Sequence, residues 1–501
     1  MFPYRLLDIQ DPLIHDLISF SPELILIAGI VSLLLARLVK AFDGLHLIPL
    51  AVLACAGALA LLVPLLVPQR GLVVGGTAFT GLLALDPFAD ALRGIVLLTA
   101  LLVLLLGLAT GLPDREDSAD YGVLVLGAAL GMMLMASANH LLMVFLAVEM
   151  ASLPSYALAG FLKGKPKGSE AALKYVVFGA AASGIMLYGI SLLTARFGTG
   201  HLFALGKALS IQLATAGWDP QLAAGVLFLC VGLGYKISAV PFHLWLPDVF
   251  EGAAAEVGAF LSIASKAAAL GLATRIVYRL TYGHPDGLAV YDPGLSYAIQ
   301  IAAAVTATVG NLAAYGQTNL KRLLGYSTIA HAGYMLIAIA PLGGDGWAAV
   351  LGYLIAYLPA NFGAFAVVAA VRNRTGSEDV SAVRGLISRS PVLGVGFAVC
   401  IMSLLGLPPL AGFAAKFQVF SLAYDSGLTW LLVVGVINTV VSAGYYLKIL
   451  RTIGLDDPAD PSPLGEPAFL RFLLLLSMAA LFVMGLLWGP ISLGLAMFHL
   501  A

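Results

Sequence analysis

Apolar runs long enough to cross a lipid bilayer as helices follow one another from end to end of this chain. Crossing the hydrocarbon core takes about 18 apolar residues or more, and fourteen segments qualify. Hydrophobic residues make up 60% of the 501 residues and charged residues only 11%, which excludes a soluble domain. We predict an all-α polytopic membrane protein with about 14 transmembrane helices, at 21–40, 46–68, 91–111, 121–137, 140–162, 169–196, 221–247, 253–280, 296–314, 322–342, 346–372, 391–423, 428–451 and 467–490.

Lysine and arginine are divided unequally between the two faces that these helices define. Fifteen of the 26 follow odd-numbered helices: Arg37, Lys40, Arg115, Lys163, Lys165, Lys167, Lys321, Arg322, Arg372, Arg374, Arg384, Arg389, Lys448, Arg451 and Arg471. Seven lie on the other face: Arg5, Arg70, Arg93, Arg196, Lys207, Arg275 and Arg279. Because cytoplasmic loops are the richer in these residues, both termini are predicted on the non-cytoplasmic side. Residues 1–24 do not resemble a secretory signal, so the first helix is expected to remain.

Prolines interrupt two of the predicted helices at comparable places. Pro241 and Pro247 flank FHLWL in the seventh, and Pro408 and Pro409 lie within LLGLPPLAGFAAKF in the twelfth. Proline breaks a helix, and a broken helix at membrane depth must be buried in protein or line a wet cavity. Two breaks five helices apart indicate two inverted five-helix repeats, at 116–282 and 283–452, with a three-helix flank at 1–115 and a final helix within 453–501. The alternative is that these prolines only kink helices for packing.

Four lysines fall inside predicted spans, namely Lys174, Lys236, Lys266 and Lys416. A lysine at mid-bilayer costs about 2.5 to 3.5 kcal/mol, which a purely structural chain would avoid. Glu149 is the acid placed most centrally in a span. Burial favours the neutral amine whereas a nearby carboxylate favours the ammonium, so such a row can take up and release protons. Static ion pairing, above all between Glu149 and Lys174, is the alternative.

Two histidines extend the row of ionisable residues. His243 follows Pro241 beyond the first break, and His331 lies near the middle of the tenth predicted helix. Histidine changes charge near neutral pH and suits proton transfer, although each could equally be a structural residue. The three cysteines are isolated, which gives no support to a disulfide, zinc or iron–sulfur site. We expect no cofactor or metal in this chain and, with a net charge of -1, no nucleic-acid partner.

The segments that carry these residues have characteristic sequence motifs: SEAALKYVVFGAAASGIMLYGISLL from Ser169, KISAVPFHLWLPDVFEG from Lys236, LSIASKAAA from Leu261, NLKRLLGYSTIAHAGY from Asn319 and LLGLPPLAGFAAKF from Leu404. Over about residues 120 to 450 the chain resembles the antiporter-like membrane subunits of respiratory complex I, the bacterial NADH:quinone oxidoreductase, and of multisubunit cation/proton antiporters. After PDVFEG the family usually continues with a turn that contains proline and threonine, whereas this chain has AAAEVGAF, which adds Glu256 and lacks the proline. This acid at a helix start suits the helix dipole.

The resemblance implies a role for each ionisable residue. Glu149 and Lys174 would form a coupling pair, Lys236 would be the central lysine of the broken seventh helix, Lys266 a connecting lysine and Lys416 the terminal one. His243 matches a position that assists the relay.

The resemblance also implies a proton-translocating subunit without a redox centre. It would lie in the inner membrane of a bacterium beside other antiporter-like and small membrane-arm subunits and, through them, a hydrophilic arm that oxidises NADH. A D-type subunit of a multisubunit sodium/proton antiporter is the first alternative. A non-pumping scaffold is the second.

Overall fold

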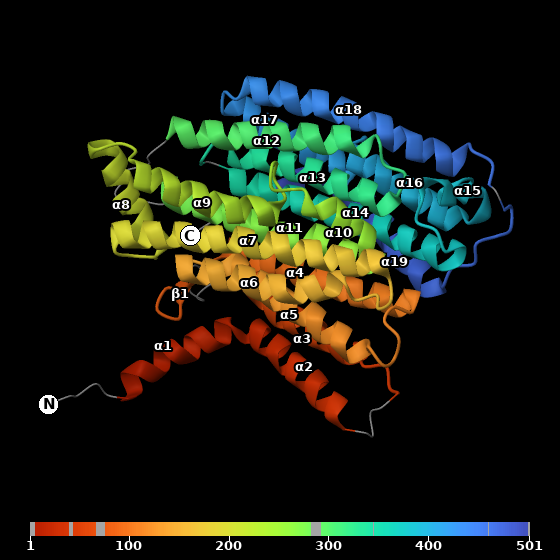
Figure 1. Ribbon diagram of the computed structural model, residues 1–501, viewed down its shortest axis with the longest axis horizontal. Coiled ribbons are helices and arrows are strands. Elements are labelled where there is room, and N and C mark those ends of the chain that lie inside the picture. The colour runs from red at the N-terminus through yellow and green to blue at the C-terminus, as the bar shows by residue number, and fades with distance from the viewer. Residues whose placement is uncertain are drawn as a thin grey trace.

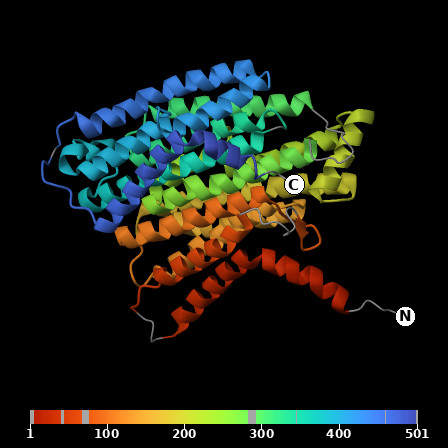
Figure 2. The ribbon, with the colours of Figure 1, turned by 180° about the vertical axis from the view of Figure 1, so that it is seen from behind.

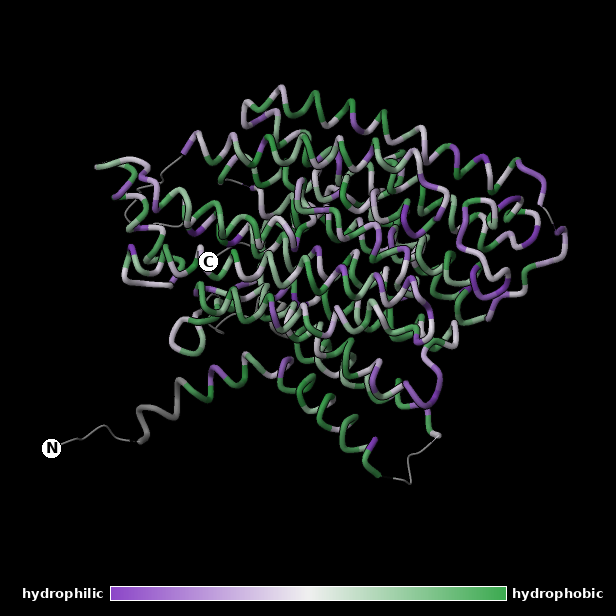
Figure 3. Tube along the Cα trace, in the orientation of Figure 1, coloured by the Kyte–Doolittle hydropathy of each residue, from purple (hydrophilic) through white to green (hydrophobic). Residues whose placement is uncertain are grey.

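The computed structural model describes residues 6–39, 44–66, 76–281, 292–343, 345–458 and 460–498. Arg5, Lys40 and Arg70 of the charge analysis lie outside these residues. In the described part, the long helices run side by side, while the first helix, Leu6–Ser19, extends away from the bundle (Figures 1 and 2). Hydrophobic positions cover most of the helices, and hydrophilic ones are prominent in the connections at their ends (Figure 3).

The N-terminal part contains four helices and a small hairpin. Asp86 accepts a hydrogen bond from the backbone N–H of Ala89 and Pro87 occupies the first helical position, while Gly111 in the left-handed conformation ends the same helix. This is the usual pattern of helix start and stop signals. The elements are α1 (Leu6–Ser19), α2 (Ser21–Leu38), α3 (Ile48–Leu66), β1 (Gly76–Ala78), β2 (Leu83–Leu85) and α4 (Pro87–Thr110). The strands pair antiparallel, with Thr77 opposite Ala84.

The remaining helices form two consecutive groups. The first group comprises α5 (Ser118–Ser137), α6 (Leu141–Ala159), α7 (Pro166–Phe197), α8 (Leu202–Thr215), α9 (Pro220–Ile237), α10 (Trp245–Gly252) and α11 (Ala255–Thr281). The second comprises α12 (Pro293–Ala314), α13 (Leu320–Ile339), α14 (Gly346–Thr375), η2 (Val380–Val383), α15 (Leu386–Arg389), α16 (Pro391–Leu405), α17 (Ala411–Asp425) and α18 (Thr429–Gly454). The chain continues with α19 (Ala468–Leu486) and α20 (Trp488–Leu495).

Each predicted span corresponds to one of these helices or to a broken pair of them, so the all-α polytopic prediction is confirmed. Eleven helices of the described residues are long and apolar enough to cross a membrane. The broken seventh span is α9 plus α10, and the broken twelfth is α16 plus α17. The short elements α1, β1, β2, α8, η2, α15 and α20 were not predicted, because each is too short to leave a membrane-spanning signature.

Two helices form the centre of the molecule. Within their most apolar 18-residue windows, α11 is 100% buried and α14 is 94% buried by the rest of the chain. These two helices pack against each other and therefore join the first group to the second. Polar side chains on α11 and α14 are consequently enclosed by protein, where they need partners within the chain.

Candidate functional site

The two helix breaks have the same backbone geometry. The half-helix α9 ends at Ser238, whose φ is 64°, and α16 ends at Gly406, whose φ is 91°. A left-handed residue stops each half-helix and leaves its last carbonyl groups without intrahelical partners. Serine tolerates this conformation poorly, which marks Ser238 as a position held in place by its surroundings. Each break therefore presents carbonyl oxygens, at the negative end of a helix dipole, inside the bundle.

At the first break these oxygens surround the ammonium of Lys266. Its Nζ donates to the carbonyl of Ile237 at 2.8 Å, to the hydroxyl of Ser238 at 2.5 Å and, more weakly, to the carbonyl of Lys236 at 3.4 Å. The Trp245 ring centroid lies 5.4 Å from the same nitrogen. Lys266 is 0% exposed on the central helix α11. Its charge is thus held by neutral oxygens and an aromatic face.

Lys236 lies in the last turn of the half-helix α9 and is 1% exposed. Its Nζ donates to the hydroxyl of Ser152 at 2.8 Å. Ser152 lies three residues after Glu149 on α6, so the two side chains share a helix face. One carboxylate oxygen of Glu149, Oε1, is buried and has no hydrogen-bond partner in the described residues. The spacing brings Glu149 to the neighbourhood of Lys236, with Ser152 in direct contact.

The second break holds Lys416 in a comparable way. Its Nζ donates to the carbonyl of Leu405, the last residue of α16, at 2.9 Å. The ring of Tyr334 lies 4.8 Å from the same nitrogen. Lys416 is 4% exposed. At both breaks, therefore, a buried lysine from another helix is bound at the C-terminal end of a half-helix and lies near an aromatic ring.

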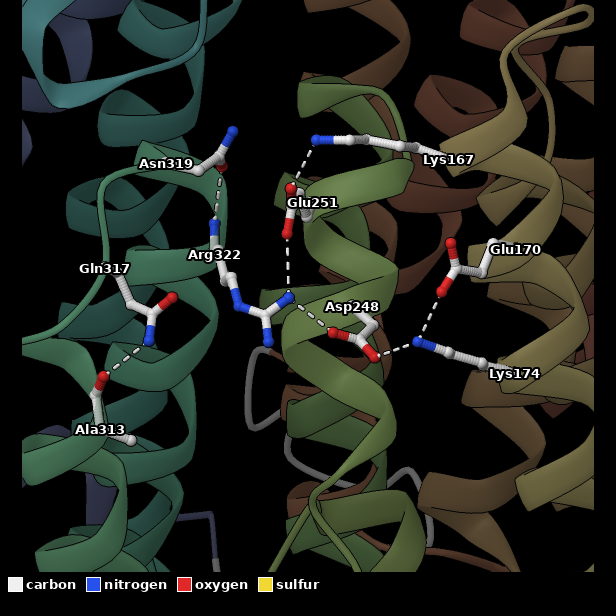
Figure 4. Close-up of polar contacts among 9 residues, drawn as sticks. All are labelled: Lys167, Glu170, Lys174, Asp248, Glu251, Ala313, Gln317, Asn319 and Arg322. Atoms are coloured by element: carbon white, nitrogen blue, oxygen red, sulfur yellow. Dashed lines mark hydrogen bonds and ion pairs between the residues drawn. The ribbon is translucent and has the colours of Figure 1, made fainter.

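Lys174 lies differently from the other three lysines. Its side chain is 37% exposed near the start of α7, and its Nζ binds Glu170 at 2.7 Å and Asp248 at 2.6 Å. The expected partner Glu149 is replaced here by these two carboxylates (Figure 4). Asp248 also binds Arg322 of α13 at 2.6 Å. Lys174 is thus part of a charged network near one end of the bundle, and its expected burial is wrong for this structure.

The two histidines occupy unlike positions. His243, in the connection between α9 and α10, is 8% exposed, and its Nδ1 has no partner in the described residues. His331 of α13 lies among tyrosines, with Nδ1 2.8 Å from the hydroxyl of Tyr353 and Nε2 3.3 Å from that of Tyr446. A small cavity of 10 Å³ is lined by His331 and by Ser403 and Ala415 of the second break. Such a space is close to the size of one water molecule.

Hydroxyl and amide groups connect Lys266 to the surroundings of His331. Ser262, one turn before Lys266 on α11, accepts a hydrogen bond from Nδ2 of Asn361 at 2.5 Å. Tyr357 lies one turn from Asn361 on α14, and its hydroxyl is 2.9 Å from that of Thr328, which precedes His331 by three residues. Residues one turn apart lie on one face of a helix. A buried row of polar groups therefore crosses from the first helix group to the second.

Other buried charges are paired and belong to the framework. Arg93 binds Glu23 at 2.5 Å and Asp90 at 2.6 Å. The guanidinium of Arg275 binds Asp86 through two hydrogen bonds of 2.5 and 2.8 Å. These guanidiniums have ionic partners, as does the buried Lys321, which binds Glu378 at 2.8 Å, whereas Lys236, Lys266 and Lys416 donate to neutral oxygens.

Further positions that the sequence singled out are also placed by the structure. The buried Glu256, which marks the departure from the family pattern, accepts from the hydroxyl of Thr110 at 2.7 Å. Cys55 and Cys400 are buried and Cys230 is exposed. No group of metal-ligating side chains is found among the described residues.

Sequence reasoning missed several residues of this site: Ser152, Asp248, Tyr353, Asn361 and Tyr357. Ser152 could have been found from its three-residue spacing from Glu149, and Asp248 stands inside a quoted motif. The others come from α14, whose uniform hydrophobicity hides which face is polar.

The chain is similar to known proteins in sequence and in fold. Residues 138–442 match the family described as NADH:quinone oxidoreductase/Mrp antiporter, TM. The chain is 42% identical to NADH-quinone oxidoreductase subunit N 2 of Sorangium cellulosum over 95% of this chain and 96% of that one. It is 37% identical to NADH-quinone oxidoreductase subunit N of an Anaeromyxobacter species over 97% of this chain and 96% of that one.

Two solved structures share the architecture. One chain of respiratory complex I from Thermus thermophilus is 33% identical and superimposes with a TM-score of 0.78, covering 95% of this chain and all of that one. One chain of the Mrp complex of a Dietzia species is 22% identical with a TM-score of 0.81, covering 97% of this chain and 96% of that one. The second likeness establishes the fold alone. By sequence and structure together, the chain belongs to the family of antiporter-like membrane subunits of NADH:quinone oxidoreductases, in its subunit N group.

Proposed function

We propose that this chain moves protons across the membrane as a subunit of an NADH:quinone oxidoreductase, and that partner subunits carry out the electron transfer. The observation that carries the proposal is the binding of Lys236, Lys266 and Lys416 by hydroxyl and carbonyl oxygens. A neutral oxygen can accept a hydrogen bond from either an ammonium or an amine, so it does not fix the lysine in its charged form. A carboxylate partner would favour the ammonium strongly.

The contacts support an order for the relay. Glu149 and Ser152 lie beside Lys236, and Lys266 binds the backbone carbonyl of Lys236 itself. A change in charge on either lysine is therefore felt by the other at short range, where the low dielectric of the interior strengthens it. His243, with an unpartnered nitrogen next to the first break, is suited to exchange protons with water there.

The second part of the relay runs through the hydroxyl groups between the two breaks. From Ser262, next to Lys266, the row continues through Asn361 and Tyr357 toward Thr328 and His331. The cavity between His331 and the second break can hold the water that completes the path to Lys416. Hydroxyls and water both accept and donate protons, so this row can carry a proton between the repeats.

Lys174 has a different place in the proposal. Because it binds Glu170 and Asp248 near one end of α7, we infer that it acts at the border of the relay rather than within it. The resemblance assigned it to a pair with Glu149. A rearrangement that moved Asp248 away would free Lys174 to influence Glu149.

The surroundings follow from family membership and charge. The chain is a multi-pass protein of a bacterial membrane, beside other antiporter-like subunits and, through them, the arm that oxidises NADH. The excess of lysine and arginine at the end that carries Lys163, Lys167 and Arg322 supports a cytoplasmic position for that end. With an even number of spans, both termini would then lie on the other side.

The test uses membrane vesicles that contain the assembled enzyme. Proton uptake per NADH oxidised is measured with a pH-sensitive dye for the wild type, Lys236→Met and the control Lys163→Met, whose lysine is 76% exposed. We expect Lys236→Met to assemble and to lower the ratio at least twofold, with the control unchanged. An unchanged ratio in assembled Lys236→Met would refute the proposal. Proton movement that required sodium and no NADH would favour the antiporter alternative.

A further inference from the structure

A charged cavity opens between α7, α10 and α13, outside the buried lysine row. Its volume is 90 Å³, and its walls carry the side chains of Lys167, Glu170, Asp248, Glu251 and Arg322. Glu251 binds Lys167 at 2.8 Å and Arg322 at 2.9 Å. Carboxylates and cations alternate along the chain of contacts that joins these residues (Figure 4). A space of this size with polar walls is large enough to hold water.

Asp248 has a special place in this cavity. One of its oxygens accepts from Lys174 at 2.6 Å and the other from Arg322 at 2.6 Å. It therefore joins α7 of the first helix group to α13 of the second. Its side chain is 27% exposed, so water and both cations reach the same carboxylate. Protonation of Asp248 would weaken both ionic contacts together, because a neutral acid attracts a cation far less than a carboxylate does.

Behind this carboxylate lies an aromatic layer that leads to the buried lysines. Trp245, one turn before Asp248 on α10, stacks on Tyr175 with ring centroids 4.3 Å apart. Trp245 also lies near Lys266, whose nitrogen is 5.4 Å from the centroid of the Trp245 ring. The Tyr175 hydroxyl is buried and has no partner in the described residues. An unsatisfied buried hydroxyl of this kind is able to bind a water molecule.

We propose that this cavity is the mouth through which protons reach the buried lysines, and that Asp248 is the carboxylate that accepts each proton transiently, because Lys174 and Arg322 favour its charged form and restore it once the proton has left. The inference deepens the proposed function and rests on it. In the step, a proton leaves a hydronium ion in the cavity and an O–H bond forms on Asp248. That bond breaks when the proton passes inward to water at the Tyr175 hydroxyl, and the carboxylate then recovers its contacts with Lys174 and Arg322.

The same contacts give the mouth a gating element. While Asp248 is charged, Lys174 and Arg322 hold α10 against its neighbours. Once it is neutral, Lys174 keeps only Glu170, which is 62% exposed, and the first helix group is held less firmly to the second. Uptake of a proton by Asp248 is thereby linked to a weaker attachment of α10 to α7 and α13, next to the stacked rings of Trp245 and Tyr175.

The experiment compares three variants in the assembled enzyme. Asp248→Asn removes the titrating carboxylate, Asp248→Glu retains it, and Asp117→Asn is the matched control. Asp117 binds Lys163 at 2.7 Å and is 28% exposed, which resembles Asp248 in exposure and pairing without contact with the cavity. We expect proton uptake per NADH to fall at least twofold in Asp248→Asn, and to be retained in Asp248→Glu with a shifted pH profile. Asp117→Asn should match the wild type.

Three results separate the possibilities. Normal uptake in assembled Asp248→Asn overturns the inference. If Asp248→Asn fails to assemble, Asp248→Glu decides, because a pH profile identical to the wild type would show that this carboxylate takes no part in proton uptake. If Lys236→Met loses proton uptake and Asp248→Asn does not, the inference about the entry cavity is wrong and the proposed function stands. When Lys236→Met retains uptake, the proposed function itself fails.

Discussion

The buried pair of Arg275 and Asp86 allows a quantitative test of which charges only stabilise the fold. The guanidinium forms two hydrogen bonds to Asp86 and donates through Nε to the carbonyl of Ala136 at 3.2 Å. Asp86 in turn caps α4 through the N–H of Ala89. Both charged side chains are at most 1% exposed. Replacing Arg275 by methionine would leave the carboxylate buried without a cation, which costs about 3 to 5 kcal/mol.

The double variant Arg275→Met/Asp86→Asn should recover most of that loss. It removes both charges, and asparagine retains an oxygen that can cap α4. Since replacing a buried ion pair by neutral residues is often nearly neutral, the residual cost should be about 1 kcal/mol, near that of one net hydrogen bond. The recovered 2 kcal/mol or more corresponds to a factor of about 30 or more in the equilibrium between folded and unfolded chain.

Heat stability of the detergent-solubilised enzyme, followed as the fraction of this chain that remains in the complex, measures the effect. The single variant should dissociate at a much lower temperature than the double variant, and Lys163→Met should match the wild type because exposed pairs contribute little. Proton uptake per NADH should be normal wherever the complex is intact. A double variant no more stable than Arg275→Met would refute the reasoning, since the penalty would then come from lost packing.

Two further predictions concern the second helix break and the end of the bundle that carries the hairpin. A Cβ at Gly412 would overlap the backbone carbonyl of Ser403, so Gly412→Ala should cost about 1 to 3 kcal/mol. It should also lower proton uptake by displacing α17, and normal uptake would argue against a tightly set break. His140 caps α6 and touches His201 with ring centroids 4.6 Å apart, and burial, with the charge of His201, lowers the pKa of His140. The unfolded chain then binds this proton more readily, so the contribution is present above about pH 6.5 and lost as pH falls through the lower folded value. His140→Asn, which keeps a cap, should flatten the acid dependence of the melting temperature between pH 7.5 and 5.5, and an unchanged dependence would exclude His140 as its source.

The sequence predicts the broken helices well because proline acts locally. Pro241 and Pro408 remove helical hydrogen bonds wherever the chain folds, and the breaks duly follow Ile237 and Leu405. Lys236, Lys266 and Lys416 were likewise found from their positions in apolar spans, since lipid-facing charge is costly.

Partners could not be predicted in the same way. Lys174 and Asp248 are 74 residues apart, and nothing local in either segment indicates that α7 and α10 bring them together. Lys321 shows the same limit, because it begins a helix next to a loop and yet is 2% exposed, bound to Glu378. Tyr357 and Asn361 are hidden for another reason: α14 is buried on every side, so its hydrophobic pattern has no period from which a polar face can be read.

The division of labour between arginine and lysine in this bundle has a chemical reason. Arginine stays protonated at any pH a protein meets, whereas lysine can lose its proton when buried. Arg93 and Arg275 bind carboxylates, which is the arrangement that stabilises a permanent charge. Lys266 and Lys416 bind the carbonyl groups at the C-terminal ends of half-helices, which attract an ammonium moderately and can still accept a hydrogen bond from a neutral amine. If the proposed function holds, the broken helices provide binding sites for a charge that can be gained and lost, which explains why a buried lysine lies at each of the two breaks.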